Sequence, residues 1–545
     1  MKKLYTTMVI ALISINSFAQ TPNWAWAKSM GASGYEYGNS VATDATGNIY
    51  VTGGFTSPTI VFGTTTLTNS GGVGSNDMYL VKYDATGAVL WAISAGGSYN
   101  DWGYSVTTDA TGDIYVSGYF SSPTLVFGTT TLIHTALADM FLVKYDATGT
   151  VLWAKSAGGS NDDNGISVAT NATGDVYVTG FFTSPTLVFG TTTLTNAGNR
   201  DMFLVKYDAT GTVLWAKSTG GSGDDFVWSV ATDAGGDVYV VGEFASPTIV
   251  FGTTTLTNTA TSDMFLVKYD ATGLVLWAKS AGGSNYDEGI SVATDAAGDI
   301  YVTGDFASPT LVFDTTTLTN TGGFDMFLVK YDATGTVLWA KNTGGSGNDY
   351  GVSVATEAAG DVYVTGSFAS PTLVFGTTTL TNAGSDDIFL VKYDATGQVL
   401  WAKSAGGSGS DQGISVATDA AGDLYVTGAF YSPTIVFGGT TLTNSGSDDM
   451  YLAKINATTG IQEQQLVSGF SISPNPFTSH TTITFSEAQK NTTIRITDML
   501  GQEIKTINFT GKQLTIDKGE MKAGIYFVQT TDEKKNVTNK KIIIQ

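Results

Sequence analysis

The apolar residues between about residues 21 and 460 fall in short runs separated by turns rich in glycine, asparagine and aspartate. One copy of the pattern contains VLWAKSAGG (151–159), ISVATN (166–171), VYVTGFF (176–182) and MFLVKYD (202–208). β-Branched and aromatic residues are frequent in these runs, and no stretch shows the apolar period of a helix. The pattern therefore predicts a chain built from short β-strands.

The pattern returns at a fixed interval of 62 residues. The tryptophan of the VLWAK phrase marks the interval at Trp91, Trp153, Trp215, Trp277, Trp339 and Trp401. Such a period indicates stacked copies of one supersecondary unit. Each copy supplies four main strands and a threonine-rich hairpin such as SPTLVFGTTTLTN (184–196), and Asp-Ala-Thr-Gly turns join strands tightly. Four-stranded sheets packed around an axis make a β-propeller.

The strand count predicts seven blades. Strands of the SVATD type and of the FLVKY type each occur seven times, but only six VLWAK strands follow the latter. The missing partner of MYLAKI (450–455) is supplied by WAWAK (24–28) near the start of the chain. We therefore predict an all-β, seven-bladed β-propeller over residues 20–460, closed by the N-terminal strand. This closure would also hide sheet edges that invite aggregation.

The two ends of the chain differ from the repeat. Residues 1–19 combine two lysines, a short apolar run and Ser17-Phe18-Ala19, which predicts a secretory signal peptide cleaved between Ala19 and Gln20. No other apolar stretch reaches the length of a spanning helix, so we expect no transmembrane helix in the mature chain. After a linker (461–469), apolar and polar residues alternate in short runs over residues 470–545, which predicts about seven short strands and a small β-sandwich.

Both regions resemble known families. AGDVYVTG (359–366) and DIFLVKYDATG (387–397) resemble β-propeller repeats of secreted Bacteroidetes proteins. FSISPNPF (470–477), TIRITDMLGQEI (493–504) and AGIYFVQT (523–530) resemble the type A C-terminal sorting domain of the type IX secretion system. The motif residues are Pro474, Asn475, Pro476, Gly501, Gly524 and Tyr526. This resemblance implies recognition by the type IX translocon, removal by a sortase, and a secreted or cell-surface location.

The charge and the cysteine content of the chain limit the classes of partner and site that it can have. The 545 residues carry a net charge of −22, and residues 21–465 alone hold 41 acidic and 14 basic residues. Such a surface repels nucleic acid and anionic membranes, so we expect no nucleic-acid partner. It favours cations or neutral partners such as glycans. The absence of cysteine from the sequence excludes disulfides, thiolate metal sites and a cysteine nucleophile.

Two sets of acids recur with the repeat. The first lies ten residues after each repeat tryptophan: Glu36, Asp101, Asp163, Asp225, Asp287, Asp349 and Asp411. The second begins the FLVKY strands: Asp77, Asp139, Asp201, Asp263, Asp325, Asp387 and Asp449. On one face of the propeller these carboxylates could hold Ca²⁺. We favour the alternative that each acid caps its own loop, because a residue needed in every copy belongs to the repeat itself. We therefore predict no cofactor and no metal site.

Positions that depart from the repeat are better candidates for binding. The residue after the first acid varies as Tyr37, Trp102, Asn164, Phe226, Glu288, Tyr350 and Gln412, and Tyr35, Tyr104, Trp228 and Tyr286 also depart from it. Aromatic rings beside polar groups suit a sugar-stacking site. The candidate ligand-binding residues are Tyr37, Trp102, Tyr104, Phe226, Trp228 and Tyr350. The alternative, level for Trp102 and Trp228, is that these rings fill gaps between loops.

Three functions stay open. The first is a non-enzymatic binding or adhesion module with glycans as its candidate ligands, which we favour because the near-identical repeats carry no asymmetric catalytic group. The second is a carbohydrate hydrolase or lyase that uses two carboxylates of the acidic face. The third is a structural surface protein without a ligand. His134 and Arg200, the propeller region's only histidine and arginine, receive no role, and the recurring tryptophans are expected to dock blades rather than a quinone cofactor.

Overall fold

A computed structural model describes residues 22–72, 74–357, 360–457, 470–498, 502–531 and 537–545. The expected signal peptide with its Ala19–Gln20 cleavage site, the linker 461–469 and Gly501 lie outside the described residues. The chain divides into two compact units, Met1–Ala457 and Thr458–Gln545.

The first unit repeats four kinds of strand. The first strands are β2 (Glu36–Thr43), β8 (Asp101–Thr108), β14 (Asp163–Thr170), β20 (Asp225–Thr232), β26 (Asp287–Thr294), β32 (Asp349–Thr356) and β38 (Asp411–Thr418). The second strands are β3 (Ile49–Phe55), β9 (Ile114–Phe120), β15 (Val176–Phe182), β21 (Val238–Phe244), β27 (Ile300–Phe306), β33 (Val362–Phe368) and β39 (Leu424–Phe430).

The third and fourth strands complete each sheet. The third strands are β6 (Asp77–Tyr83), β12 (Asp139–Tyr145), β18 (Asp201–Tyr207), β24 (Asp263–Tyr269), β30 (Asp325–Tyr331), β36 (Asp387–Tyr393) and β42 (Asp449–Ile455). The fourth strands are β7 (Val89–Ala95), β13 (Val151–Ala157), β19 (Val213–Thr219), β25 (Val275–Ala281), β31 (Val337–Thr343), β37 (Val399–Ala405) and, from the start of the chain, β1 (Trp24–Met30).

A two-stranded hairpin accompanies each sheet. The hairpins are β4 (Thr59–Phe62) with β5 (Thr65–Thr68), β10 (Thr124–Phe127) with β11 (Thr130–Ile133), β16 (Thr186–Phe189) with β17 (Thr192–Thr195), β22 (Thr248–Phe251) with β23 (Thr254–Thr257), β28 (Thr310–Phe313) with β29 (Thr316–Thr319), β34 (Thr372–Phe375) with β35 (Thr378–Thr381), and β40 (Thr434–Phe437) with β41 (Thr440–Thr443).

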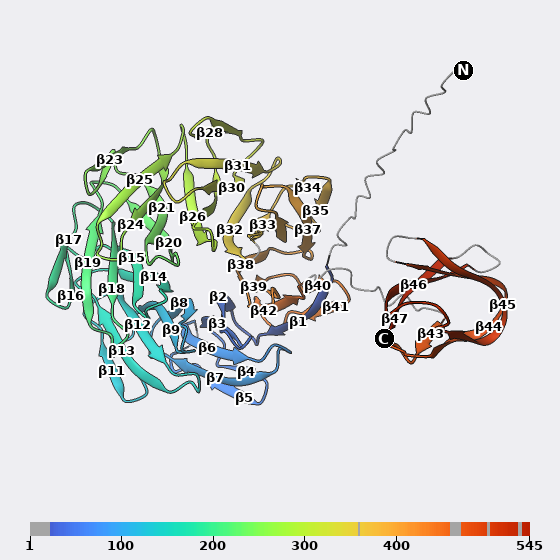
Figure 1. Cartoon of the computed structure of the whole chain (residues 1–545). Coiled ribbons are helices and arrows are strands. Elements are labelled where there is room, and N and C mark those ends of the chain that lie inside the picture. The colour runs from blue at the N-terminus through green and yellow to red at the C-terminus, as the bar shows by residue number, and fades with distance from the viewer. Residues whose placement is uncertain (1–21, 73, 358–359, 458–469, 499–501, 532–536) are drawn as a thin grey trace, which may run out of the picture. The chain divides into compact units, whose positions relative to one another are not determined.

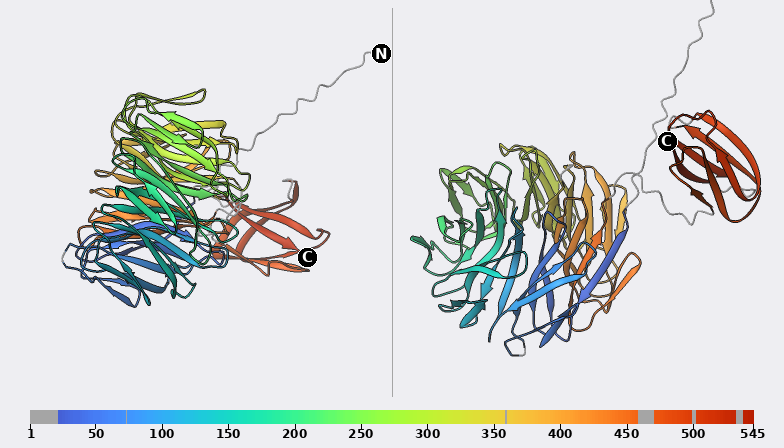
Figure 2. Two further views of the ribbon diagram at one scale, coloured as in Figure 1. Left: turned by 90° about the vertical axis from the view of Figure 1, so that its left-hand side faces the viewer. Right: turned by 60° about the horizontal axis from the view of Figure 1, so that its bottom comes forward.

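Within the described residues the main strands pair into seven four-stranded antiparallel sheets. Figure 1 shows the sheets following one another around a ring, with the first strands nearest its middle, and Figure 2 shows the same unit from two further sides. Third strands such as β12 are buried along their whole length, because each sheet packs between two others. The predicted all-β fold is confirmed, and the arrangement is that of a β-propeller.

Serine and threonine of the SVAT phrases link neighbouring first strands. Val106 N donates to Ser40 Oγ at 3.1 Å, and Thr108 Oγ1 donates to Thr43 O at 2.9 Å. The same two contacts join each successive pair of first strands. The series returns to its start through Val41 N, which donates to Ser415 Oγ at 3.1 Å. The small residues of this phrase therefore provide both close approach and hydrogen bonds.

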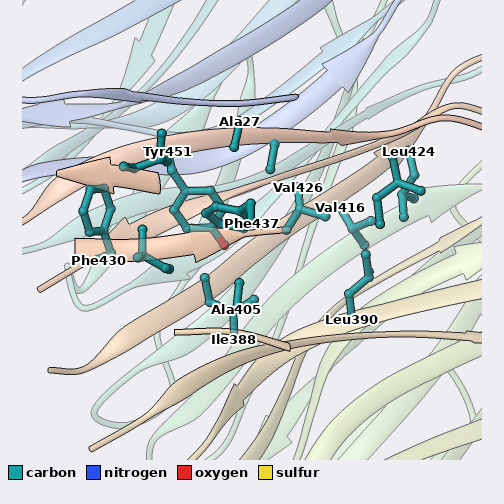
Figure 3. Packing of buried hydrophobic residues seen from close by; sticks show 14 of the residues in the cluster. Ala27, Ile388, Leu390, Ala405, Val416, Leu424, Val426, Phe430, Phe437 and Tyr451 are labelled. Carbon is teal, nitrogen blue, oxygen red and sulfur yellow. The ribbon is translucent and has the colours of Figure 1, made fainter. Parts of the chain in front are cut away.

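The last sheet takes its outer strand from the N-terminal end of the unit. β1 pairs antiparallel with β42, with Trp26 opposite Lys454 and Met30 opposite Met450. Figure 3 shows Ala27 of β1 beside Tyr451 and the other core residues of this sheet. Trp24 packs edge-on against Phe437, with ring centroids 4.9 Å apart. The predicted pairing of WAWAK with MYLAKI is confirmed.

The recurring lysine and tryptophan dock each sheet on the next. Lys144 Nζ lies 2.9 Å from Asp113 Oδ2 and 4.9 Å from the Tyr115 ring centroid. It also donates to Ala209 O, in the Asp-Ala-Thr-Gly turn of the next sheet, at 3.4 Å. Trp153 Nε1 donates to the same carbonyl at 3.2 Å. One turn thus receives both side chains, which accounts for their presence in the repeat.

Replacing one such lysine should destabilise the propeller strongly. Lys330 is buried, and its Nζ lies 2.8 Å from Asp299 Oδ2 and 3.8 Å from Asp295 Oδ2. Lys330→Ala leaves these carboxylates without a cation in a buried site, so we expect the apparent free energy of unfolding to fall by about 3–5 kcal/mol. Urea denaturation of the full chain measures this loss.

An exposed lysine of the same repeat is the matched control. Lys155→Ala removes a side chain on the solvent-facing side of β13, and we expect a change within about 0.5 kcal/mol. If the Lys330 variant were as stable as the Lys155 variant, the docking role of the buried lysines would be contradicted.

The second unit is a single curled sheet. Its strands are β43 (Phe470–Ser473), β44 (His480–Asp498), β45 (Glu503–Asp517), β46 (Gly524–Thr531) and β47 (Val537–Ile544), in the order β43-β44-β46-β47 with β45 paired to β44. Ile483 and Ile494, from the two halves of β44, share one apolar core, so the unit is sandwich-like.

The prediction of about seven short strands in this unit is wrong in number, because the described residues form five. The phrases TTITFSE (481–487) and TIRITD (493–498) are two halves of the same strand, β44. The polar residues between them form an irregularity in the register near Gln489, and Asn491 there has a φ of +44°. The strand passes through this bulge and continues, so two phrases that the sequence analysis counted as separate strands form one.

Candidate functional site

The first set of acids serves its own loops. Asp101 Oδ2 accepts hydrogen bonds from Ser122 Oγ at 2.7 Å and from Gly97 N at 2.8 Å. Equivalent pairs of donors meet the other members, Asp163, Asp225, Asp287, Asp349 and Asp411, and Glu36 is bound by Ala32 N and Ser57. All seven side chains are buried. Burial raises the pKa of Asp101, Asp163 and Asp287 to about 6.

The second set of acids lies on the same face as the first. Asp101 and Asp139 are both opposite Phe120 in the strand register, one on each side of it. Asp139 accepts a hydrogen bond from Thr135 N at 2.9 Å, so it too caps a loop. Within the described residues, no three histidine or acidic side chains are grouped in a way that could hold a metal ion.

Three of the candidate aromatic residues come together across neighbouring sheets. The ring centroids of Tyr37 and Trp102 lie 5.7 Å apart, and Tyr104 stacks on Trp102 at 6.3 Å. Tyr119 lies 5.6 Å from Tyr104, and Tyr431 Oη lies 2.6 Å from Tyr37 Oη. We call these five residues the tyrosine–tryptophan cluster. Sequence reasoning missed Tyr119 and Tyr431, although both replace small or different residues at their repeat positions.

A second group forms around Phe226. Trp228 stacks on Phe226 with centroids 5.6 Å apart and an interplanar angle of 2°. Phe181 of the preceding sheet lies 5.5 Å from Phe226, and the guanidinium of Arg200 lies over both phenyl rings. Tyr350 packs elsewhere, against Phe324 at 5.6 Å. The predicted aromatic residues thus belong to three separate groups.

Three acids outside the two repeating sets gather between neighbouring sheets. Glu288 of β26 pairs in register with Asp305 of β27, and Glu243 belongs to β21, which packs against β26. Burial and the neighbouring carboxylates raise the pKa of Glu243 to about 7, and they raise the pKa of Asp305 well above its usual range. The sequence singled out Glu288 alone. The missed signal is an acid at the residue before the last phenylalanine of VYVTGxF.

The motif residues of the C-terminal unit join its start to its last strand. Asn475 Nδ2 donates to Lys541 O at 2.9 Å, and Asn475 Oδ1 accepts from Ile543 N at 2.8 Å. Thr481 Oγ1 donates to the carbonyl oxygen of Pro474 at 2.6 Å. Pro474 is the first residue of the Pro-Asn-Pro segment, and Pro476 is the last. Tyr526, two residues after Gly524 opens β46, donates to Lys522 O at 3.0 Å. The Pro-Asn-Pro segment is therefore tied to β47.

A family model described as the secretion system C-terminal sorting domain matches residues 471–545. The C-terminal unit is therefore a sorting domain handled by the type IX secretion system, and the protein is secreted or carried on the outer-membrane cell surface. None of the described residues forms a helix with the length and hydrophobicity needed to cross a membrane.

Each curated relative matches only part of this chain and only part of its own length. An uncharacterized WD repeat-containing protein, L264, of Acanthamoeba polyphaga mimivirus is 26% identical over 79% of this chain and 38% of its own length. The regulatory protein FlaEY of Caulobacter vibrioides is 29% identical over 46% of this chain and 27% of its own. An endo-acting ulvan lyase of Formosa agariphila is 36% identical over 15% of this chain. The chain thus spans well under half the length of these relatives.

Solved structures resemble the chain only loosely. PorZ, a surface component of the type IX secretion system of Porphyromonas gingivalis, is 14% identical, covers 93% of this chain and 59% of its own, and has a TM-score of 0.38. Sqt1 of Chaetomium thermophilum is 10% identical, covers 78% of this chain and all of its own, and also has a TM-score of 0.38. At these scores the similarities carry no argument about function.

Proposed function

We propose that this protein is an exported, seven-bladed β-propeller that binds carbohydrate at the tyrosine–tryptophan cluster without chemical turnover. The observation that carries the proposal is the contact of Tyr37, Trp102 and Tyr104, three aromatic residues that depart from the repeat and come together across two neighbouring sheets. These rings are only partly buried, so part of each stays open to a ligand. Stacked aromatic surface edged with phenolic hydroxyls suits the apolar face and the hydroxyl groups of a sugar.

The hydrogen bonding of the repeating acids supports binding without turnover. A glycosidase needs two carboxylates that reach the sugar at a set separation. The carboxylates of the first set, such as Asp101 and Asp225, instead accept hydrogen bonds from a serine and a backbone N–H of their own loops. We also propose that the sorting domain is removed by a sortase after export, which would leave the propeller released or attached at the surface.

Replacing Trp102 is the direct test of this proposal. We expect the full chain to bind members of a glycan panel and Trp102→Ala to lose at least tenfold in affinity, which corresponds to about 1.4 kcal/mol. Isothermal titration with the best glycan of the panel measures the loss. Tyr350→Ala changes an aromatic residue at the same repeat position on another sheet and should bind normally. Equal binding by wild type and Trp102→Ala would contradict the proposal.

A second candidate function, a carbohydrate hydrolase or lyase, is favoured by one observation. Burial raises the pKa of Glu243 to about 7 beside Glu288 and Asp305, and a carboxyl group with such a pKa can act as a general acid near neutral pH. Turnover of a polysaccharide that is abolished by Glu243→Gln would support this alternative over simple binding.

A further inference from the structure

Arg200, the only arginine of the propeller, is held by aromatic rings. Its guanidinium carbon lies 4.5 Å from the ring centroid of Phe226 and 4.9 Å from that of Phe181. Arg200 precedes β18, Phe181 belongs to β15 of the same sheet, and Phe226 belongs to β20 of the next sheet. The side chain therefore lies across a boundary between sheets, and the rings set its orientation.

The guanidinium is not paired with the acids around it. Asp201 follows it in the chain, and Asp224 is its neighbour through a parallel backbone bridge. Within the described residues, however, no carboxylate lies within ion-pair distance of Arg200 and no side-chain hydrogen bond satisfies its donors. Burial even raises the pKa of Asp201 to about 6, which a paired guanidinium would oppose. The phenyl rings thus keep a cation free on a strongly acidic face.

A second unsatisfied donor borders the same ring. Trp228 stacks on Phe226, and its indole Nε1 is buried without a hydrogen-bond partner. Arg200 Nε is likewise buried without a partner. Buried N–H groups in folded proteins are nearly always paired with a protein, water or ligand acceptor, so each of these two donors has unused hydrogen-bonding capacity. Arg200 and Trp228 thus both contact the Phe226 ring, and each carries an N–H donor without an acceptor.

We propose that Arg200 and Trp228 form a subsite for the anionic group of an acidic sugar, a carboxylate or a sulfate. The planar guanidinium offers a fork of N–H donors that matches either group, and the indole N–H supplies a further donor. The exposed part of the stacked Trp228 ring then contacts the sugar ring. Since the acidic surface repels anions at longer range, such a ligand needs a cation without a carboxylate partner. This inference rests on the proposed carbohydrate function.

Isothermal titration of the full chain with four probes tests the subsite. The probes are an oligogalacturonate, the same oligosaccharide with its carboxylates methyl-esterified, a sulfated galacto-oligosaccharide, and a neutral galacto-oligosaccharide. We expect at least one anionic probe to bind ten or more times as tightly as its neutral counterpart. Arg200→Gln should abolish this preference, so that the anionic and neutral probes bind this variant equally well. Arg200→Lys, which keeps the charge but loses the fork, should retain only part of it.

The outcomes separate this inference from the proposed function. If wild type binds the neutral probes as tightly as the anionic ones, the subsite is overturned while the glycan-binding proposal stands. If no carbohydrate binds, both fail. If Arg200→Gln keeps the preference for the anionic probes, the assignment to Arg200 is wrong. The comparison of esterified and free oligogalacturonate on wild type alone overturns the subsite if the two bind equally, even if a variant does not fold.

Discussion

Deleting residues 22–30 is expected to unfold the last sheet of the propeller and to make the protein aggregate. These residues include β1, which supplies the outer strand beside β42, buries Ala27 and Met30, and packs the partly buried Trp24 against its neighbours. The loss of two tryptophans and a methionine from packed surroundings should cost more than about 5 kcal/mol. It also exposes the edge of β42, a strand that is buried along its whole length in the intact protein.

Circular dichroism, melting temperature and light scattering measure this effect. Deletion of Pro22 and Asn23 alone, which precede β1, is the matched control and should leave the melting temperature unchanged. A synthetic peptide of residues 22–31, added in excess, should bind the open edge and restore part of the lost stability. A deletion variant as stable and monomeric as the control would show that β1 does not close the propeller.

Lowering the pH from 8 to 5 is expected to raise the melting temperature of the propeller. Burial raises the pKa of seven carboxyl groups to about 6: Asp101, Asp163, Asp201, Asp287, Asp387, Asp448 and Asp449. The unfolded chain binds protons at the ordinary aspartate pKa of about 3.9, so between these values the folded state holds more protons. Stability therefore rises as the pH falls through about 6 and levels off below about 4.

Carboxyl groups whose pKa is lowered by folding make the protein less stable as the pH falls, but only at lower pH. Hydrogen bonds from Asn48 and Thr46 outweigh burial and lower the pKa of Asp44 to about 2, so its contribution is lost only below about 4. The net gain between pH 8 and 5 should be about 5 °C in melting temperature.

Tryptophan fluorescence follows this transition cleanly, because all ten tryptophans precede residue 402 and report on the propeller alone. Asp101→Asn removes one titrating group, so it should flatten the pH dependence even if it lowers the melting temperature at every pH. A melting temperature that fell steadily from pH 8 to 5 would contradict the raised pKa values of the buried acids.

The sequence alone determined the architecture of the first unit and the secreted or cell-surface location of the protein. The period of 62 residues, the VLWAK and FLVKY phrases and the orphan WAWAK predicted the four-stranded sheets and the pairing of β1 with β42. The sequence predicts these features because the alternation of apolar and polar residues in strands and the residue preferences of turns are local, and because the same pattern occurs in every repeat. The Pro-Asn-Pro phrase and its companions likewise indicated the sorting domain.

Only the tertiary structure decided which exceptional side chains meet. Tyr37 and Tyr431 are 394 positions apart in the chain, yet their hydroxyls lie 2.6 Å apart because the ring brings its last sheet beside its first. Arg200 meets Phe181 and Phe226 because the sheets pack face to face, so each side chain has neighbours from another repeat. Contacts between repeats depend on twist and packing distance, which no local pattern encodes. The repeat therefore predicted the positions of the candidate residues, while the packing of the sheets formed the groups.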